Sequence, residues 1–479
     1  MLRHSLAVTT IAVVQFLPLS SRANAETIQC GAGDVQCLIS AINQANVDPH
    51  NTTIHLAGGI YALTSLNNVA NGPNGLPTIT SPVTVEAGKD GATLARVEGA
   101  PGFRILRVGG SGRLTLEGIT LAGGDATTFV PGDLLTISGG AILNAGGVVT
   151  ASNTVFDGNS SEEFGGAIFS NNGNLSIDNS TFSGNVSSFG GGLSIRGGSV
   201  KITRTTFDNN YAPGAAGGVW TENATTYISQ SRFEENGGGH AVGGVLVRGG
   251  TASINESTFK RNVSDPAGAL WADSQALVTV LNSAFVENRG AGGGSGILNA
   301  ANVNVINTTF ARNVGGSISF LGIAILNVGT MTLINTTFAE NTTYGGNGPG
   351  TQPASVISSG PTATTALQNT ILVHNTQDLY LWDCYGGTFV SLGNNVIGDP
   401  SPCNMSIQLT DRLGDAGLGN LVDDGTPGNA HFPLLPDSQA IDGANAAACP
   451  KKDQIGRPRT AHCDIGAVEF INGLGHLID

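Results

Sequence analysis

The stretch that decides the fold is residues 165–185, which read GGAIFSNNGNLSIDNSTFSGN. It opens with a glycine pair followed by Ala167 and Ile168, and it ends with Phe182 and, three residues later, Asn185. Residues 191–210 repeat this pattern as GGLSIRGGSVKITRTTFDNN. Self-similarity at a period of about 20–50 residues is typical of repeat architectures, so the chain is predicted to consist of stacked copies of one unit.

The phenylalanine–asparagine motif recurs in phase through the middle of the chain. Successive phenylalanines lie 25–28 residues apart. A glycine pair followed by an aliphatic residue keeps the same period at residues 139–142, 165–168, 191–193, 217–219 and 243–245. One Phe-x-x-Asn motif alone carries no information, whereas eight in phase are specific: Phe156 with Asn159, Phe182 with Asn185, Phe207 with Asn210, Phe233 with Asn236, Phe259 with Asn262, Phe285 with Asn288, Phe310 with Asn313, and Phe338 with Asn341.

The repeat has the composition of short β-strands. Residues 201–207 alternate in polarity, clusters of Gly, Asn and Ser interrupt such stretches, and no apolar stripe of helical period recurs. A unit of 26 residues suits three short strands and three turns. We therefore predict an all-β fold, a single-stranded right-handed parallel β-helix of the pectate-lyase-like solenoid type, with about 26 residues per coil and disulfide-stapled ends.

Stacked coils explain which residue types repeat. The phenylalanines are predicted to point inward and to stack on one another. Each asparagine is predicted to adopt the left-handed backbone of a tight turn and to hydrogen-bond along the axis through its amide. A second inward column is expected five residues before each phenylalanine, at Ile177, Ile202, Ile228, Ile254, Val280, Val305 and Leu333.

The chain is predicted to have four regions. Residues 1–25 read as a cleaved signal peptide, because a basic start, the apolar stretch 6–19 and Ala23-Asn24-Ala25 follow one another. Residues 26–100 are expected to form an N-terminal cap and the first coils, 101–376 the β-helix repeats, and 377–479 a C-terminal capping region. A short amphipathic helix is predicted at 34–44 and a protruding loop at 345–353. The mature chain is expected to be secreted or cell-surface, without a transmembrane segment, in a bacterium.

The cysteines lie only at the two ends of the chain. Six cysteines allow fifteen pairings, and proximity favours Cys30 with Cys37, Cys384 with Cys403, and Cys449 with Cys463. A metal site is not indicated, because no C-x-x-C pair or nearby histidine accompanies them. We predict three local disulfides, which stabilise ends where a β-helix exposes unpaired strand edges.

Charge restricts the partners. A net charge of −14 argues against nucleic acid and anionic membranes, which require basic surfaces, and disfavours polyanionic glycans. The sequence has no H-E-x-x-H, G-x-S-x-G, P-loop or EF-hand pattern, so no catalytic residue and no metal ligand is assigned.

Two charge ladders follow the repeat. Two residues after successive phenylalanines stand Glu235, Arg261, Glu287, Arg312 and Glu340, which alternate in sign and predict an axial salt-bridge ladder. The second ladder is Arg196, Glu222 and Arg248, with Asp273 expected one residue out of register. By strand alternation Trp220 and Leu246 point outward beside this second ladder.

Two interpretations of the second ladder stay open. Arg196, Trp220, Glu222 and Arg248 are candidate glycan-binding residues, because an exposed indole flanked by charges offers a sugar both stacking and hydrogen bonds. Alternatively, a loop covers the ladder and Trp220 only packs beneath it.

The chain resembles two groups of exported proteins. Residues 139–142 and 165–168, together with the Phe-x-x-Asn motifs, resemble the β-helix repeats of polymorphic outer-membrane proteins. Residues 369–372, 394–398, 434–442, 453–459 and 463–469 look like the C-terminal region of choice-of-anchor Q proteins. The resemblance implies a surface or extracellular right-handed β-helix and, for the outer-membrane relatives, adhesion.

Two functions remain open. The first is an exported, non-enzymatic interaction protein, adhesin-like or matrix-associated, whose partner is an extracellular glycan or protein. The alternative is a polysaccharide lyase or glycoside hydrolase that acts on a long glycan in a groove along the β-helix. No cofactor is predicted, and Ca²⁺ is expected only under the lyase alternative.

Overall fold

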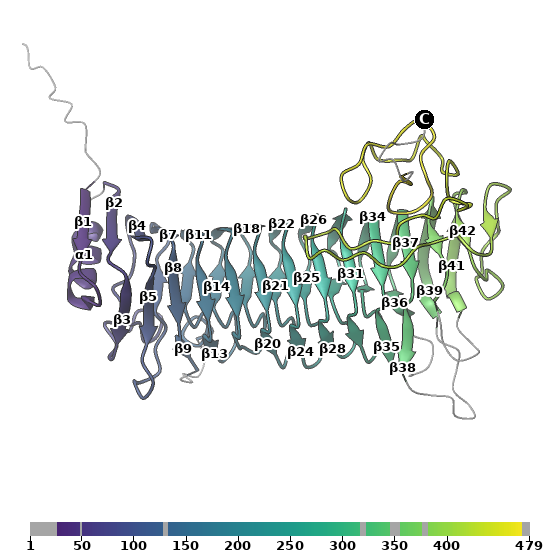
Figure 1. Ribbon diagram of the computed structural model, residues 1–479. Helices are drawn as coiled ribbons and strands as arrows, with labels where there is room; N and C mark the ends of the chain where they lie inside the picture. The colour runs from purple at the N-terminus through teal and green to yellow at the C-terminus, as the bar shows by residue number, and fades with distance from the viewer. Residues whose placement is uncertain are drawn as a thin grey trace, which may run out of the picture.

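The computed structural model describes residues 26–47, 50–127, 133–316, 322–344, 355–375 and 382–471. Its strands stack in parallel along one axis and form an elongated solenoid (Figure 1). The fold is a right-handed parallel β-helix, which confirms the predicted fold class. The signal peptide predicted at residues 1–25 and the loop predicted at 345–353 lie outside the described residues.

Three columns of strands enclose the core. The first column contains β6 (Leu106–Val108), β10 (Ile142–Ala145), β14 (Ile168–Asn171), β17 (Leu193–Arg196), β21 (Val219–Glu222), β25 (Val245–Arg248), β29 (Leu270–Asp273), β33 (Ile297–Asn299), β36 (Gly322–Asn327), β39 (Ser355–Gln368) and β41 (Trp382–Ser391). The second contains β1 (Glu26–Cys30), β2 (Thr52–Leu56), β4 (Pro82–Ala87), β7 (Arg113–Glu117), β11 (Val148–Ser152), β15 (Asn174–Asp178), β18 (Ser199–Thr203), β22 (Thr225–Ser229), β26 (Thr251–Asn255), β30 (Leu277–Leu281), β34 (Asn302–Ala311) and β37 (Thr330–Ala339).

The third column closes the coil, and a fourth, shorter column follows it. The third contains β3 (Gly59–Leu63), β5 (Ala92–Arg96), β8 (Ile119–Ala122), β12 (Val155–Asp157), β16 (Thr181–Ser183), β19 (Thr206–Asp208), β23 (Arg232–Glu234), β27 (Thr258–Lys260), β31 (Ala284–Val286), the C-terminal ends of the long strands β34 and β37, β40 (Ile371–Leu372), β42 (Val396–Ile397) and β43 (Arg412–Leu413). The fourth contains β9 (Asp125–Ala126), β13 (Ser160–Ser161), β20 (Tyr211–Ala212), β24 (Gly237–Gly238), β28 (Val263–Ser264), β32 (Arg289–Gly290), β35 (Val314–Gly316) and β38 (Thr342–Tyr344).

The predicted aromatic column fills the core. All eight phenylalanines are fully buried, and neighbouring rings stack with centroids 4.5–4.9 Å apart and interplanar angles of 3–16°. The aliphatic column five residues earlier is buried as well, from Ile177 to Leu333. Both predicted columns are confirmed.

The asparagines form a buried amide ladder. Each side-chain Nδ2 donates to the Oδ1 of the asparagine one coil further on, at 2.9–3.0 Å between Asn159 and Asn375. The predicted hydrogen bonding along the axis is confirmed. The predicted left-handed backbone at the asparagine was wrong, because positive φ falls one residue earlier, for example at Glu235 (φ 53°) and Arg261 (φ 52°). That residue makes the turn, which directs the asparagine side chain inward.

A helix and a disulfide close the N-terminal end. Helix α1 (Val35–Val47) confirms the helix predicted near residues 34–44, and it buries Leu38, Ala41, Ile42 and Ala45 against the first strands (Figure 1). Cys30 on β1 is bonded to Cys37 on α1. The apolar ends of the first coils are thereby covered.

The other two disulfides lie in the C-terminal region. Cys384 on β41 is bonded to Cys403, which packs with Met405 against the last part of the core. Cys449 is bonded to Cys463. All three predicted pairings are confirmed.

Beyond β43 the chain turns back along the solenoid. This C-terminal strap, residues 414–471, crosses the outer face of the third column toward the middle of the molecule (yellow in Figure 1). Ala430 and Phe432 of the strap cover a patch of outward apolar side chains, formed by Ala284, Val286, Ala311 and Ala339.

Polar contacts fix the strap to successive coils. Thr258, Thr309 and Thr337 occupy the same position, one residue before the core phenylalanine. Thr258 Oγ1 accepts a hydrogen bond from Gly428 N (2.8 Å), Thr309 Oγ1 donates to Gln454 Oε1 (2.6 Å), and Thr337 Oγ1 accepts from Ala467 N (3.0 Å). Within the described ranges no helix has the length and hydropathy that a membrane crossing requires.

Candidate functional site

The second charge ladder lies on the outer face of the first column. Arg196 Nε contacts Glu222 Oε2 at 2.6 Å, and Arg248 lies 3.8 Å from Glu222 Oε1 and 3.6 Å from Asp273 Oδ2. Asp273 pairs in register with Arg248. The predicted offset at Asp273 was therefore wrong, because the coil between them is shorter by one residue and the strands realign.

Trp220 points outward from β21 but is only 3% exposed. Its ring lies 5.1 Å from Phe164 and 6.2 Å from Phe189, both on the turns that follow the fourth column. Leu246 is buried in the same apolar cluster. Trp220 is thus not an exposed stacking platform, and the alternative interpretation, packing beneath a loop, describes its environment.

The Arg196 guanidinium lies over the aromatic rings of this apolar cluster, on its solvent side. Its guanidinium carbon lies 4.8 Å from the Phe164 ring centroid and 5.9 Å from that of Trp220, within the range of cation–π attraction. Burial raises the pKa of the nearby Glu163, a rise to which Glu162 adds and which Arg196 opposes. The outer ends of Arg196, Glu222 and Arg248 reach solvent, and their glycan-binding role stays a prediction.

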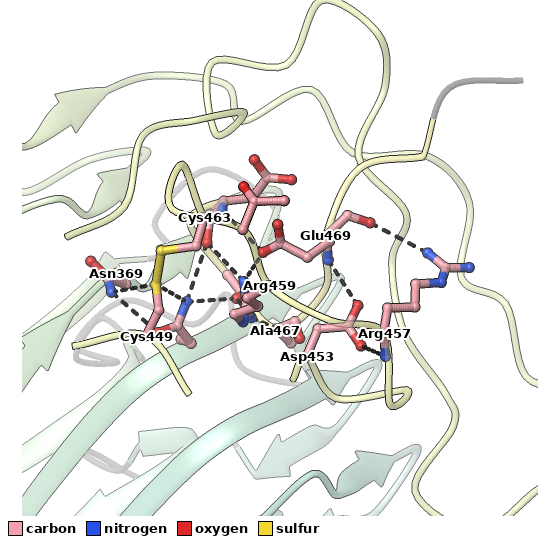
Figure 2. A network of polar contacts seen from close by, with 12 residues as sticks. Asn369, Cys449, Asp453, Arg457, Arg459, Cys463, Ala467 and Glu469 are labelled. Carbon is pink, nitrogen blue, oxygen red and sulfur yellow. Dashed lines mark hydrogen bonds and ion pairs between the residues drawn. A yellow bond between two sulfur atoms is a disulfide. The ribbon is translucent and has the colours of Figure 1, made fainter. Parts of the chain in front are cut away.

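The C-terminal motif segments form a buried polar network (Figure 2). Arg459 and Glu469 make an ion pair whose side chains are 1% and 4% exposed. Asp453 Oδ1 accepts from Arg457 N at 2.8 Å and Oδ2 from Glu469 N at 2.9 Å. Burial raises the pKa of Glu469 to about 7 against the attraction of Arg459. These contacts stabilise the fold of strap residues 453–469.

The Cys449–Cys463 disulfide adjoins the network and links it to the solenoid (Figure 2). Asn369 Nδ2 lies 3.5 Å from Cys449 Sγ, and Asn445 N donates to Asn369 Oδ1 at 2.8 Å. The contacts of the motif are made within the protein and join the strap to the solenoid, and among the described residues the buried Arg459 Nε has no hydrogen-bond partner.

The tip of the strap ends in a cluster of mixed charge, which we call the strap-tip cluster; it comprises Asp208, Arg232, Glu234, Lys260, Arg261 and Asp423. Glu234 lies between Arg232 (2.9 Å) and Arg261 (2.5 Å). Lys260 Nζ contacts Asp423 Oδ2 at 2.7 Å, and Arg232 donates to the Gly425 carbonyl. The solenoid and the strap meet through these charges.

The pKa values of two carboxyl groups in the strap-tip cluster, those of Asp208 and Asp423, are shifted in opposite directions. Asp208 and Glu234 are register partners on β19 and β23. Partial burial raises the pKa of Asp208, and the negative charges of Glu234 and Glu235 raise it further. The hydrogen bond from Lys260 lowers the pKa of Asp423, although partial burial opposes the change.

A groove opens beside this cluster, where the strap reverses direction between Val422 and His431. This strap-tip groove, of about 370 Å³, is lined by Arg204, Thr205, Thr206, Gln230, Arg232, Glu256, Thr426 and Pro427. A second hollow of about 280 Å³ shares Glu256, Thr426 and Pro427. Gln230 Nε2 donates to Glu256 Oε2 at 2.8 Å, and Arg204 pairs with Asp178. Side chains of three successive coils therefore line one groove, in which polar groups stand on a surface that is more apolar than polar.

The first ladder is formed as predicted in its main contacts. Arg261 lies 2.9 Å from Glu235 and 3.7 Å from Glu287, and Arg312 lies 2.6 Å from Glu340. No cluster of His, Cys, Asp or Glu suited to hold a metal ion occurs among the residues that the structure describes.

Sequence reasoning missed the strap and therefore the groove. One pattern pointed to a covered face: the outward residue after the core phenylalanine is Asp208, Glu234 or Lys260 in the middle coils but Val286, Ala311 and Ala339 later. Apolar side chains on an outer face need a cover. The strap itself has no periodicity, so its position was not predictable.

Comparisons with known proteins give distant structural matches and no sequence match. No family model matches the chain, and no curated protein matches it. The crystal structure of pectate lyase Pel9A shares 13% identity, over 94% of this chain and 97% of that one, with a TM-score of 0.32. Tailspike protein 3 of bacteriophage CBA120 shares 12% identity, over 76% of this chain and 59% of its own, with a TM-score of 0.34. The two repeat-family resemblances stay predictions.

Proposed function

We propose that this protein is an extracellular, non-enzymatic interaction protein that binds a glycan in the strap-tip groove. The observation that carries the proposal is the groove itself. Arg204, Gln230 and Glu256 occupy equivalent positions on three successive coils, and Thr426 of the strap forms the opposite wall. Regularly spaced donors and acceptors in a shallow groove suit the repeated hydroxyl groups of a polysaccharide.

The charges of the groove favour a neutral glycan. Arg204 is paired with Asp178, Arg232 with Glu234, and Glu256 with Gln230. The groove therefore offers hydrogen bonds without a surplus of either charge. With a net charge of −14, the whole molecule repels polyanions.

The proposal places the protein outside the cell. Its six cysteines form three disulfides, which persist in oxidising compartments. We keep the proposed division into a signal peptide (1–25), a cap with the first coils (26–100), repeats (101–376) and a C-terminal capping region (377–479). Adhesin-like attachment to a surface, through the glycan or a protein partner, belongs to the same proposal.

The test is an array of neutral plant, algal and bacterial glycans, followed by calorimetry on the best binder. Arg204→Ala combined with Gln230→Ala should weaken that binding by about 1–3 kcal/mol. Arg248→Ala, on the outer face of the first column, serves as the matched control and also tests the predicted ladder site. A loss confined to Arg248→Ala would move the site to that ladder, and a loss in neither variant would refute the groove.

One observation favours an enzyme as the second candidate. Asp208, whose pKa is raised, and Glu234, which contacts two arginines, are register partners, and the two carboxyl groups of a glycoside hydrolase must likewise be close neighbours. Reducing-end and unsaturated-product assays on the bound polysaccharide test this candidate. Turnover that disappears in Asp208→Asn would replace the binding proposal by hydrolysis.

A further inference from the structure

A narrow apolar strip lies on the outside of the fourth strand column. The outward residues of successive coils here are Val186, Tyr211, Gly237 and Val263. Val186 is 41% exposed, Tyr211 47% and Val263 48%. The neighbouring residue on β20, Ala212, points inward and is fully buried. The strip is therefore a regular feature of the solenoid surface, three coil steps long and one residue wide.

Glycine at position 237 lets the tyrosine ring lie against the sheet. A Cβ atom on Gly237 would lie 2.9 Å from Cδ2 and 3.5 Å from Cε2 of Tyr211. The ring thus leans over the next coil and occupies the space where that coil has no side chain. The Cδ2–Cε2 edge of the ring lies over Gly237, and nearly half of the residue remains exposed. A supported, exposed aromatic ring of this kind is a stacking surface.

Charged groups border the strip on one side. Asn209, Glu235 and Arg261 stand two residues before Tyr211, Gly237 and Val263, and the last two of them belong to the first charge ladder. Arg261 is paired with Glu235 at 2.9 Å, and the two side chains are 42% and 54% exposed. The border therefore supplies a donor and an acceptor of hydrogen bonds and carries no surplus positive charge.

We propose that this strip is a second carbohydrate site, which stacks a pyranose ring of a neutral glycan on Tyr211. A pyranose presents carbon-bound hydrogens on one face and hydroxyl groups at its rim, which matches an aromatic ring beside Glu235 and Arg261. A folded protein partner is less well matched, because a stable protein interface buries about 800 Å² on each side. The site is separate from the strap-tip groove and does not depend on it.

The test uses protein in which the groove is disabled by Arg204→Ala and Gln230→Ala, so that failure of the groove cannot affect the result. Cellohexaose, maltohexaose, xylohexaose and chitohexaose are titrated in turn by calorimetry. At least one should bind, and Tyr211→Ala should weaken it roughly tenfold or more, as for an aromatic hot spot. Tyr211→Phe keeps the ring and should retain the affinity within about threefold.

Two further variants separate stacking from general damage. Gly237→Val displaces the ring without removing it and should weaken binding as Tyr211→Ala does. Tyr227→Ala removes another exposed tyrosine (40%), on the second column, and should leave the affinity unchanged. The proposal is overturned if none of the four hexasaccharides binds the groove-disabled protein, or if Tyr211→Ala binds as tightly as its parent while both keep the same melting temperature.

Discussion

At the scale of single residues, one asparagine per coil has the largest structural role. Asn236 accepts hydrogen bonds from the backbone N (3.0 Å) and side-chain Nδ2 (2.9 Å) of Asn210, and its own Nδ2 donates to Phe207 O and Asn262 Oδ1. All these groups are buried. A buried donor or acceptor that loses its partner is costly, which explains why the residue type repeats without exception from 159 to 341.

We predict that Asn236→Ala destabilises the surrounding coils by about 2–4 kcal/mol, because several buried polar groups lose their partners. Thermal unfolding and hydrogen exchange of residues 205–265 measure the effect. Asn209→Gly changes an exposed neighbour whose positive φ (52°) glycine adopts without strain, and it is the control. Equal melting temperatures for the two variants would contradict a stabilising ladder.

At the scale of elements, the strap covers outward apolar side chains of the third column, which thereby become buried. Its apolar contribution is concentrated in Phe432, which is 2% exposed and packs on alanines and a valine of the third column. The buried Arg459–Glu469 pair then fixes the fold of the strap around it. Packing and buried polar contacts act together, because neither partner of a buried ion pair can be removed cheaply.

Phe432→Ala is expected to release the strap at a cost of about 3–5 kcal/mol. Limited proteolysis should then cleave within residues 414–471 while the coils remain resistant. Leu435→Ala removes a strap side chain that is 42% exposed and should change stability by less than about 0.5 kcal/mol. Resistance of the Phe432→Ala strap to protease would show that the apolar contact does not hold it.

The stability of the solenoid end around β41 should depend on pH. Burial, reinforced by Asp399, raises the pKa of Asp383 from 3.8 to about 7, although Asp399 N donates to its carboxylate at 2.7 Å. A carboxyl with a raised folded pKa contributes stability that is fully present at low pH and is lost as the pH rises from about 4 toward 7. Asp383→Asn should therefore be more stable than the parent at pH 8 but not at pH 4, as measured by thermal unfolding. The exposed Asp437→Asn should leave the pH profile unchanged, and a profile that Asp383→Asn does not alter would disprove the assignment.

The parts of the fold that follow from periodicity were predictable, and the parts that depend on distant segments were not. Phe156 to Phe338 and the aliphatic column behave as their spacing indicates, because stacking imposes one residue type on each position. Trp220 alternates outward as predicted, yet Phe164 and Phe189 from earlier turns bury it. The local pattern of a strand predicts which side chains point outward but not which distant segment covers them. For the same reason the strap-tip groove could not be predicted from the sequence.

At the scale of the whole molecule, stability is distributed along the axis. Each coil contacts mainly its two neighbours, so the solenoid behaves as a sum of coil and interface terms. The disulfides lie outside the repeated middle, at β1 with α1, at β41 and in the strap. Two of the three disulfides therefore lie where stacking supplies a neighbour on one side only, and the third closes a loop within the strap.

Reduction should accordingly loosen the molecule from its ends. We expect dithiothreitol to accelerate hydrogen exchange at residues 26–47, 382–413 and 414–471, while residues 150–315 keep their protection. Each closed loop contributes about 2–4 kcal/mol in an unstrained disulfide, enough to fray an end but not the stacked middle. The triple variant Cys30→Ser, Cys384→Ser and Cys449→Ser should reproduce the pattern without reductant. Uniform loss of protection along the chain would mean that the molecule unfolds as one cooperative unit.

The amide ladder also gives the solenoid an electrical direction. From Asn159 to Asn341 one Nδ2–H of each amide donates to the asparagine of the next coil, and the Oδ1 of each later asparagine accepts from the previous coil. The other Nδ2–H donates to a phenylalanine carbonyl of the previous coil, for example from Asn236 to Phe207. The C=O dipoles of the side chains therefore point the same way along the axis. Each amide carries about 3.5 D, as a peptide group does, and the row resembles a second, all-side-chain macrodipole buried along the axis. Its negative pole is satisfied by Gly124 N, which donates to Asn159 Oδ1 at 2.9 Å, and its positive pole at Asn375 by the carbonyls of Phe338 and Val373. A coil duplicated anywhere inside this row would lengthen the dipole without leaving an unmatched pole, so the protein can change length by whole coils while its two ends stay the same.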